Sequence, residues 1–268
     1  MRTSIEVKNK LKLISQMGEE SKFQILRYDS LQGTSNLKSV LAIKSIEANG
    51  QRLKQVRILL SDSGVKLQDD VLSYMKGYIE RSDIVHEYKG IKKILFEGKY
   101  LIDSNIKTLF RGNGEILLKP SFNDFTLIEL VDEEIIINDD IFYACDEEIN
   151  ILLVSNNDNY KEIKLSGSGI VALKLPVPES EIIRCKLFND KLVVNDDLVI
   201  LKSNNIKMSV EKYERLIDDD TIEESNVTFN GIGEVWLLPT RSIYDKYGKI
   251  DIDSDEEYEG YEETYEKI

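Results

Sequence analysis

Three acidic turns contain carboxylates that could take part in catalysis or bind a cation. Their segments read VKLQDDV at residues 65–71, IIINDDI at 135–141 and LVVNDDL at 192–198. Two carboxylates at a fixed separation can act as acid and base in a hydrolase, and clustered carboxylate and amide oxygens can bind a cation. Asn and Asp are also ordinary turn residues because they hydrogen-bond their own backbone, and we favour this structural interpretation. The carboxylates that an enzyme would use are Asp70, Asp140 and Asp197.

The histidine and cysteine content argues against catalysis of the common kinds. His86 is the single histidine, whereas metal-dependent enzymes of β-barrel type hold their metal with two or more His and a carboxylate. No nucleophile or carboxylate is fixed beside it, so we interpret His86 as a solvated strand residue. Cys145 and Cys185 are too far apart in sequence to indicate a disulfide framework or a zinc site. The sequence therefore predicts no catalytic residue, no metal ligand and no cofactor.

The end of the chain has the carboxylate spacing of a calcium-binding EF-hand loop. Loop positions one, three, five and twelve are occupied by Asp251, Asp253, Asp255 and Glu262. Glu256 takes the sixth position, where the sharp turn requires glycine, and no flanking helices are evident. We interpret residues 241–268 instead as a disordered acidic tail that contains tyrosines.

These residues must be positioned by a β unit that occurs three times along the chain. An apolar residue followed by Gly-x-Gly and then alternating apolar residues occurs at 110–118 (FRGNGEILL), 165–173 (LSGSGIVAL) and 229–237 (FNGIGEVWL). Each copy is closed by a proline, and each is preceded by one of the acidic turns. The glycines that define the structural repeat are Gly112, Gly114, Gly167, Gly169, Gly231 and Gly233.

The Gly-x-Gly motif indicates close packing in a strand. Two glycines at this spacing leave two bare positions on one strand face, where another backbone or a bulky neighbour can approach. A phosphate-binding loop would need a helix directly after the glycines, and strand-forming residues stand there instead. We expect an all-β fold, a β-sandwich or barrel built from three degenerate repeats with pseudo-threefold symmetry.

The same patterns predict the domain organisation. Residues 1–55 would form strands or a short helix that join the β domain, residues 56–240 the three-repeat domain, and residues 241–268 the tail. The repeats would span 56–120, 126–176 and 183–240. Short segments rich in β-branched or aromatic residues predict strands at 84–88, 92–96, 126–130, 182–188 and 206–210.

Helix is expected only at residues 210–217 and within the first twenty residues. The first twenty residues interleave basic and apolar side chains, which fits either a segment resting on a membrane or an edge strand, and we prefer the strand.

Charge and composition limit the partners. A formal net charge of −14 predicts repulsion from nucleic acid and from anionic membranes. Nine Asp or Glu and one Lys lie within residues 251–268, so the rest of the chain is only mildly acidic. No apolar run is long enough for a transmembrane helix, and the first 17 residues lack the pattern of a secretory signal. We therefore expect no nucleic-acid partner, no transmembrane segment and a cytoplasmic location.

Residues 57–240 resemble the altered-inheritance-of-mitochondria family and its bacterial relatives. The opening of that family is similar to GVKLQDDVLSYMKGYIE at residues 64–80, and its closing strand is similar to FNGIGEVWLLP at 229–239. The resemblance implies a double-stranded β-helix fold like that of the tryptophan RNA-binding attenuation protein. It also implies a link to membrane organisation in mitochondria and a homo-oligomeric state, and it supplies no catalytic residues.

The leading hypothesis is a non-enzymatic binding or scaffold protein that self-associates into a closed homo-oligomer, for which a trimer would suit the threefold plan. Residues 135–137 are three consecutive isoleucines, so at least one should point away from the chain's own core and provide a docking surface. Two alternatives stay open. One is a membrane-surface organising protein, which the charge disfavours, and the other is a hydrolase-like enzyme that uses carboxylates between repeats.

Overall fold

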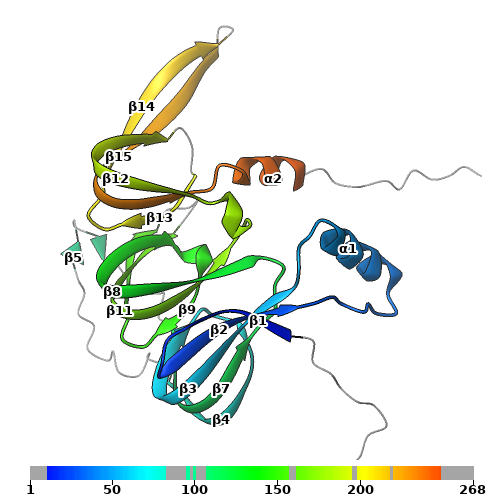
Figure 1. The fold of residues 1–268 in the computed structure, drawn as a ribbon. Coiled ribbons are helices and arrows are strands. Elements are labelled where there is room, and N and C mark those ends of the chain that lie inside the picture. The colour runs from blue at the N-terminus through cyan, green and yellow to red at the C-terminus, as the bar shows by residue number, and fades with distance from the viewer. Residues whose placement is uncertain are drawn as a thin grey trace, which may run out of the picture.

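The chain folds mainly into β-strands, as expected from the sequence. A computed structural model describes residues 11–82, 95–96, 99–100, 107–156, 161–194, 198–217 and 220–248. Thirteen of the described strands form one antiparallel sheet, whose main path runs β1-β2-β3-β9-β11-β8-β13-β15-β12. Figure 1 shows three groups of strands stacked one above another, the blue and cyan group at the bottom, the green group in the middle and the yellow group at the top.

The lowest group combines an N-terminal hairpin with a three-stranded unit. The preferred edge-strand interpretation is confirmed for residues 11–17, because β1 lies at one end of the sheet path. Helix α1 (Leu37–Ala48) begins where the side chain of Asn36 accepts a hydrogen bond from the amide of Ser39, and none of its residues is buried. The strands are β1 (Leu11–Met17), β2 (Ser21–Tyr28), β3 (Lys54–Leu67), β4 (Leu72–Ser82) and β7 (Thr108–Leu118), with the separate pair β5 (Leu95–Phe96) and β6 (Lys99–Tyr100).

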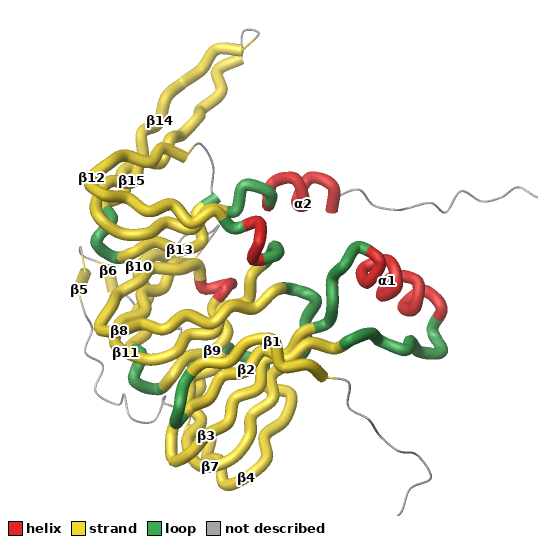
Figure 2. Tube along the Cα trace, in the orientation of Figure 1, coloured by secondary structure: helices red, strands yellow, loops and turns green. Residues whose placement is uncertain are grey.

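The middle and upper groups repeat the same succession of long and short strands. The middle group contains β8 (Asp124–Asn138), the short helix η2 (Asp139–Ile141), β9 (Phe142–Asp146), β10 (Asn150–Asn156) and β11 (Lys161–Leu175). The upper group contains η3 (Glu179–Glu181), β12 (Ile183–Val194), β13 (Val199–Ser203), β14 (Lys207–Ile217), β15 (Asp220–Leu237) and helix α2 (Arg241–Gly248). In Figure 2 the hairpin of β14 and β15 extends beyond the rest of the strands.

A β-bulge interrupts the long strand opposite each Gly-x-Gly strand. The pairing of β3 with β7 shifts between Leu60 and Ser63, and β8 and β12 have similar shifts opposite β11 and β15. One residue in each bulge has a left-handed backbone, namely Asp62 (φ 50°), Asp132 (φ 53°) and Asn189 (φ 64°). Asp and Asn tolerate this region better than most side chains. The bulges bend the long strands, which keeps the sheet curved around its core.

Three hydrophobic clusters follow the three groups, and the lowest and middle clusters each extend into the next group. The lowest cluster contains Phe23, Ile58 and Ile116, and the upper one contains Leu187, Phe229 and Val235. The middle cluster includes Ile135 and Ile137, which are 7% and 1% exposed, and it extends to the side chain of Trp236 on β15. Ile136 is half-buried and lies on the other strand face, so one of the three consecutive isoleucines does point away from this cluster.

The expected strands within the described residues are present, but the expected helix is wrong. Residues 126–130 lie inside β8, and β12 and β14 begin within a residue of the expected starts at 182 and 206. Residues 210–217 belong to β14 and pair with β15, because hairpin pairing overrides a helix-compatible local pattern. Helices form at α1 and α2 instead. Residues 84–88 and 92–94 lie outside the described part of the chain.

Candidate functional site

The acidic turns are built into the framework by ion pairs. Asp139 is 8% exposed, and its Oδ1 accepts a 2.7 Å hydrogen bond from Nζ of Lys107, which is 4% exposed. The same ammonium group donates to the side chain of Gln68 in the first turn. Lys107 therefore joins the first two acidic turns. A buried ion pair of this kind is costly to break, because either partner alone would be left charged and desolvated.

Two of the three candidate catalytic carboxylates, Asp70 and Asp140, lack an active-site environment. The side chain of Asp70 is 92% exposed and forms a 2.7 Å ion pair with Lys119, and Asp140 is exposed. An acid and base pair in a hydrolase needs at least one carboxyl removed from water beside a second. Asp197, His86 and the EF-hand-like carboxylates of the tail lie outside the described residues. Within the described ranges, no group of three or more His, Cys, Asp or Glu side chains can hold a metal ion.

The six repeat glycines lie in strands with little room for side chains. Their φ values range from +123° to +154°, a region that side chains rarely adopt. A Cβ at Gly112 would lie 2.1 Å from the carbonyl oxygen of Tyr78, and one at Gly231 would lie 2.8 Å from that of Asn205. These contacts agree with the close-approach interpretation. Strand residues follow the glycines in β7, β11 and β15, so no helix N-terminus is available for a phosphate.

A side chain caps the backbone next to the second glycine of the later two motifs. Asp146 Oδ2 accepts a 2.6 Å hydrogen bond from the amide of Ile170, and Ser203 Oγ accepts a 2.9 Å hydrogen bond from the amide of Glu234. Burial raises the pKa of Asp146, although the hydrogen bond from Ile170 lowers it. The roles of Asp146 and Ser203 are structural, since both side chains support the strand.

The cysteines do not provide a reactive nucleophile. Cys145 is fully buried in the middle cluster, and burial raises the pKa of its thiol to about 12. A thiol with that pKa carries almost no thiolate at neutral pH, and the thiolate is the reactive form. Cys185 is half-buried, and both cysteines are free.

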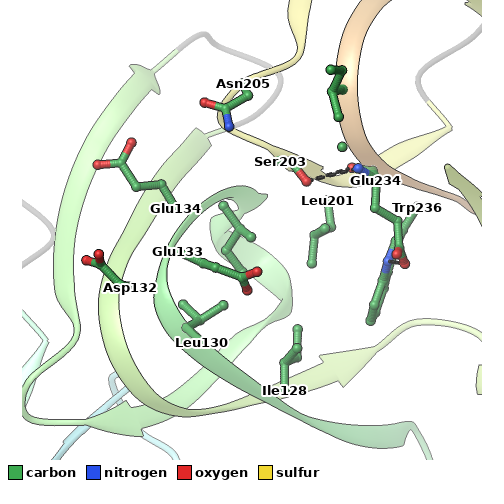
Figure 3. A pocket seen from close by; sticks show the side chains of 13 residues that line it. Ile128, Leu130, Asp132, Glu133, Glu134, Leu201, Ser203, Asn205, Glu234 and Trp236 are labelled. Atoms are coloured by element: carbon green, nitrogen blue, oxygen red, sulfur yellow. Dashed lines mark hydrogen bonds between the residues drawn. The ribbon is translucent and has the colours of Figure 1, made fainter. Parts of the chain in front are cut away.

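An open groove lies where the middle and upper groups meet. It encloses about 560 Å³ and is lined by residues of β8, β13 and β15 and by Asn205. Ile128, Leu130, Leu201 and Trp236 give it an apolar floor. Figure 3 shows Asp132, Glu133 and Glu134 along one side of this space, with Glu234 and Trp236 on the other.

The rim of the groove is acidic, and no Lys or Arg lines it. Glu134 pairs with Lys164 at 3.3 Å, and Glu234 accepts a 2.6 Å hydrogen bond from Nε1 of Trp236. Within the described part of the chain, the carboxylates of Asp132 and Glu133 have no hydrogen-bond or ion-pair partner. The groove combines apolar surface with uncompensated negative charge, which suits a ligand that is both apolar and cationic.

Sequence reasoning did not identify this groove, although the strand that forms one wall carries more apolar residues than a one-sided strand requires. The available signal was the VDEE stretch at residues 131–134, where the alternation of β8 breaks at the bulge.

The chain belongs to the family described as Mitochondrial biogenesis AIM24, which matches residues 46–240. This is the class of protein that the two sequence motifs suggested. No curated protein sequence matches the chain.

Among solved structures, the chain is similar to the crystal structure of protein SPYM3_0169 from Streptococcus pyogenes, with a TM-score of 0.50 and 16% sequence identity. The match covers 74% of this chain and 94% of that one. At this identity the likeness concerns the fold alone. No helix in the described residues is long and apolar enough to span a membrane.

Proposed function

We propose that the chain is a non-enzymatic scaffold of three β repeats that self-associates through the free edges of β4 and β12. The observation that carries the proposal is a strand register that recurs in all three groups. The family description, mitochondrial biogenesis, suggests the process in which such a scaffold acts.

The register around the Gly-x-Gly strands supports three copies of one unit. Two positions after the second glycine, each motif has a residue that pairs with two strands, namely Ile116, Val171 or Val235. On one side its partner lies on a long strand, β3, β8 or β12. On the other side its partner lies on β4, β9 or β13, which we call the short strands. The long-strand pairs are Ile116 with Ile58, Val171 with Ile128, and Val235 with Cys185. The short-strand pairs are Ile116 with Met75, Val171 with Cys145, and Val235 with Lys202. The three bulges also fall at matching positions, which favours the pseudo-threefold, double-stranded β-helix plan.

Successive repeats are joined by the same short ladder. At the first junction β3 pairs with β9, with Val65 opposite Asp146 and Leu67 opposite Ala144. At the second junction β8 pairs with β13, with Ile135 opposite Ser203 and Ile137 opposite Leu201. The matching positions are 70 residues apart on the long strands and 57 apart on the short ones.

At the two ends of this series, one long strand and one short strand each keep an edge that no junction covers. Among the described residues, β12 pairs only with β15, and β4 pairs only with β7. On β4, Tyr74 and Met75 are 46% and 43% exposed, whereas their counterparts Ala144 and Cys145 on β9 are fully buried. Tyr74 and Met75 are therefore exposed at positions whose counterparts on β9 are buried by a junction between groups.

A second copy is the partner that fits these edges. Continuing the same register places Val193 of β12, which is 44% exposed, opposite Met75 of the neighbouring copy. Because each chain offers one edge of each type, association is head to tail, and closure into a ring covers the β4 edge and the β12 edge of every copy. A trimer would carry the threefold plan of the chain into the assembly.

Light scattering coupled to size exclusion tests the proposal. The wild-type chain should elute as a multiple of its 30.8 kDa mass. Val193→Asp and Met75→Asp should each disrupt the ring, since a carboxylate at either position would be buried against apolar side chains. Each variant keeps one intact edge, so an equimolar mixture of the two should form dimers that neither forms alone.

Val131→Asp is the matched control. Val131 is 68% exposed at the β8 bulge, away from both free edges, so this variant should keep the wild-type mass. A wild-type chain that stays a single species of 30.8 kDa at micromolar concentrations would refute the proposal.

A further inference from the structure

The first repeat junction contains a strand that the second junction lacks. Strand β2 pairs with residues 54–60 of β3, beside the residues of β3 that pair with β9 at the junction. Phe23 of β2 lies opposite Ile58 and is completely buried. Its first residue, Ser21, donates a 3.5 Å hydrogen bond from Oγ to the carbonyl of Gly64. The neighbouring Gly18 lies against Ile170 of β11. The N-terminal hairpin thus fills the space between the first two repeats.

The groove described above is the same space at the second junction. Ile128 of β8 corresponds to Ile58, and Glu234 of β15 corresponds to Ile170, by the register given above. No strand in the described part of the chain pairs with this edge of β8 between residues 124 and 130. The part of this position beside Ile128 and Leu130 is the open groove of about 560 Å³, whereas η3 contacts β8 at Asp124 and Thr126 through Glu179.

We propose that this groove binds an extended peptide segment that carries apolar and basic side chains, as an added strand on β8. A free strand edge offers backbone donors and acceptors along its length, which is the basis of β-strand addition. The apolar floor around Ile128 and Leu130 would take the inward side chains. The unpaired carboxylates of Asp132 and Glu133 would face the basic ones. The inference relies on the repeat plan proposed above, but on a different surface from the free edges.

The acidic rim selects against other ligand classes. Negative charge at Asp132, Glu133 and Glu234 repels phosphate groups, so nucleic acid and anionic lipid headgroups are disfavoured. A groove bordered by a free strand edge is also better suited to an extended chain than to a compact molecule.

The probe is a synthetic peptide with the sequence SKFQILRY, which is β2 itself, with two basic residues and no acidic one. Trp236 is the single tryptophan and lies in the groove floor, so its fluorescence reports binding directly. We expect saturable binding of the peptide to the full chain in the micromolar range. Glu133→Lys should weaken binding by about tenfold or more, because it replaces attraction with repulsion at the rim.

Glu129→Lys is the matched control. Glu129 lies on the same strand, one residue from Ile128 and on the opposite face, so the same charge change there should leave binding within about twofold of wild type. Hydrogen exchange provides the second readout, since strand addition should slow exchange of amides within residues 124–130.

Four outcomes would overturn the inference. They are no change in Trp236 fluorescence, equal weakening by the two Lys variants, binding without protection of residues 124–130, and equal binding of arginine amide alone. The last would indicate a small-cation pocket. The peptide should bind the Val193→Asp variant as well as wild type. Peptide binding and self-association can therefore fail independently.

Discussion

Cys145 shows how a side chain with reactive chemistry is used for packing. It is fully buried in the middle cluster, and burial raises the pKa of its thiol to about 12. We expect a thiol reagent such as DTNB at pH 8 to modify at most Cys185 in the native protein, and both cysteines in denaturant. Rapid modification of the Cys185→Ser variant under native conditions would contradict this burial.

Asp146 links the stability of the middle group of strands to pH. Burial raises its pKa above the ordinary value of 3.8, so the folded chain holds this proton more tightly than the unfolded chain. Where the folded state binds more protons, stability falls as pH rises. The Asp146 contribution should therefore destabilise the protein progressively above about pH 4, and at neutral pH the desolvation of the carboxylate is present in full.

Asp146→Asn tests this directly, since an amide oxygen can still accept the hydrogen bond from Ile170 and carries no charge. Urea unfolding at a fixed protein concentration should show the variant gaining stability relative to wild type between pH 4 and pH 7. Parallel pH profiles for the two proteins would exclude Asp146 as a contributor.

At the scale of the elements, the glycine strands should respond to substitution according to their nearest neighbours. Gly112→Ala would place Cβ 2.1 Å from the carbonyl oxygen of Tyr78 in the adjacent strand, so the two strands must separate. We expect a loss of at least about 2 kcal/mol in unfolding free energy. Gly167→Ala meets its nearest carbonyl, that of Glu148, only at 3.0 Å and should cost less.

Gly50→Ala is the control for backbone strain alone. Gly50 has a φ of +88°, and no atom lies within 4 Å of the place that a Cβ would take, so its loss should be about 1 kcal/mol. Thermal or urea unfolding of the three variants measures the order. Equal losses at Gly112 and Gly50 would show that close approach of strands does not constrain the motif.

The sequence predicted the glycine strands and turns well because their signals are local. Gly-x-Gly, the Asx turns and alternating apolar residues each act over a few positions. Residues 210–217 of β14 were wrongly expected to be helical, since the pairing of Val210 with Val227 that stabilises them as a strand is set by the hairpin. The bulges at Asp62, Asp132 and Asn189 were also missed, because single polar residues look like ordinary surface positions. Their intervals of 70 and 57 residues match those of the acidic turns, and this was the signal that could have located them.

At the scale of the whole molecule, the groove could not be predicted from the repeats alone. The repeat pattern indicates that the two junctions are alike, but it does not indicate that residues 21–28 cover only the first. That difference depends on the N-terminal hairpin, which has no counterpart among the described residues that lead into β8. If the proposed repeat plan holds, the groove is open because the strand equivalent to β2 is present once.

Net charge should control how readily copies associate. Residues 251–268 carry a net charge of about −8 of the total −14, from nine acidic residues and one lysine. This composition offers little apolar surface to bury, so deletion of these residues should leave the melting temperature within about 2 °C. Deletion also lowers repulsion between copies. We expect the truncated chain to assemble at lower concentration than the full chain in dilute salt.

Salt distinguishes this electrostatic effect from a docked tail. Above roughly 0.5 M salt the Debye length falls below about 5 Å, and the two chains should then assemble at the same concentration. Light scattering over a dilution series at both salt concentrations measures this. If the truncated chain loses several degrees of melting temperature, or assembles less readily than the full chain at every salt concentration, the tail contributes contacts rather than charge alone.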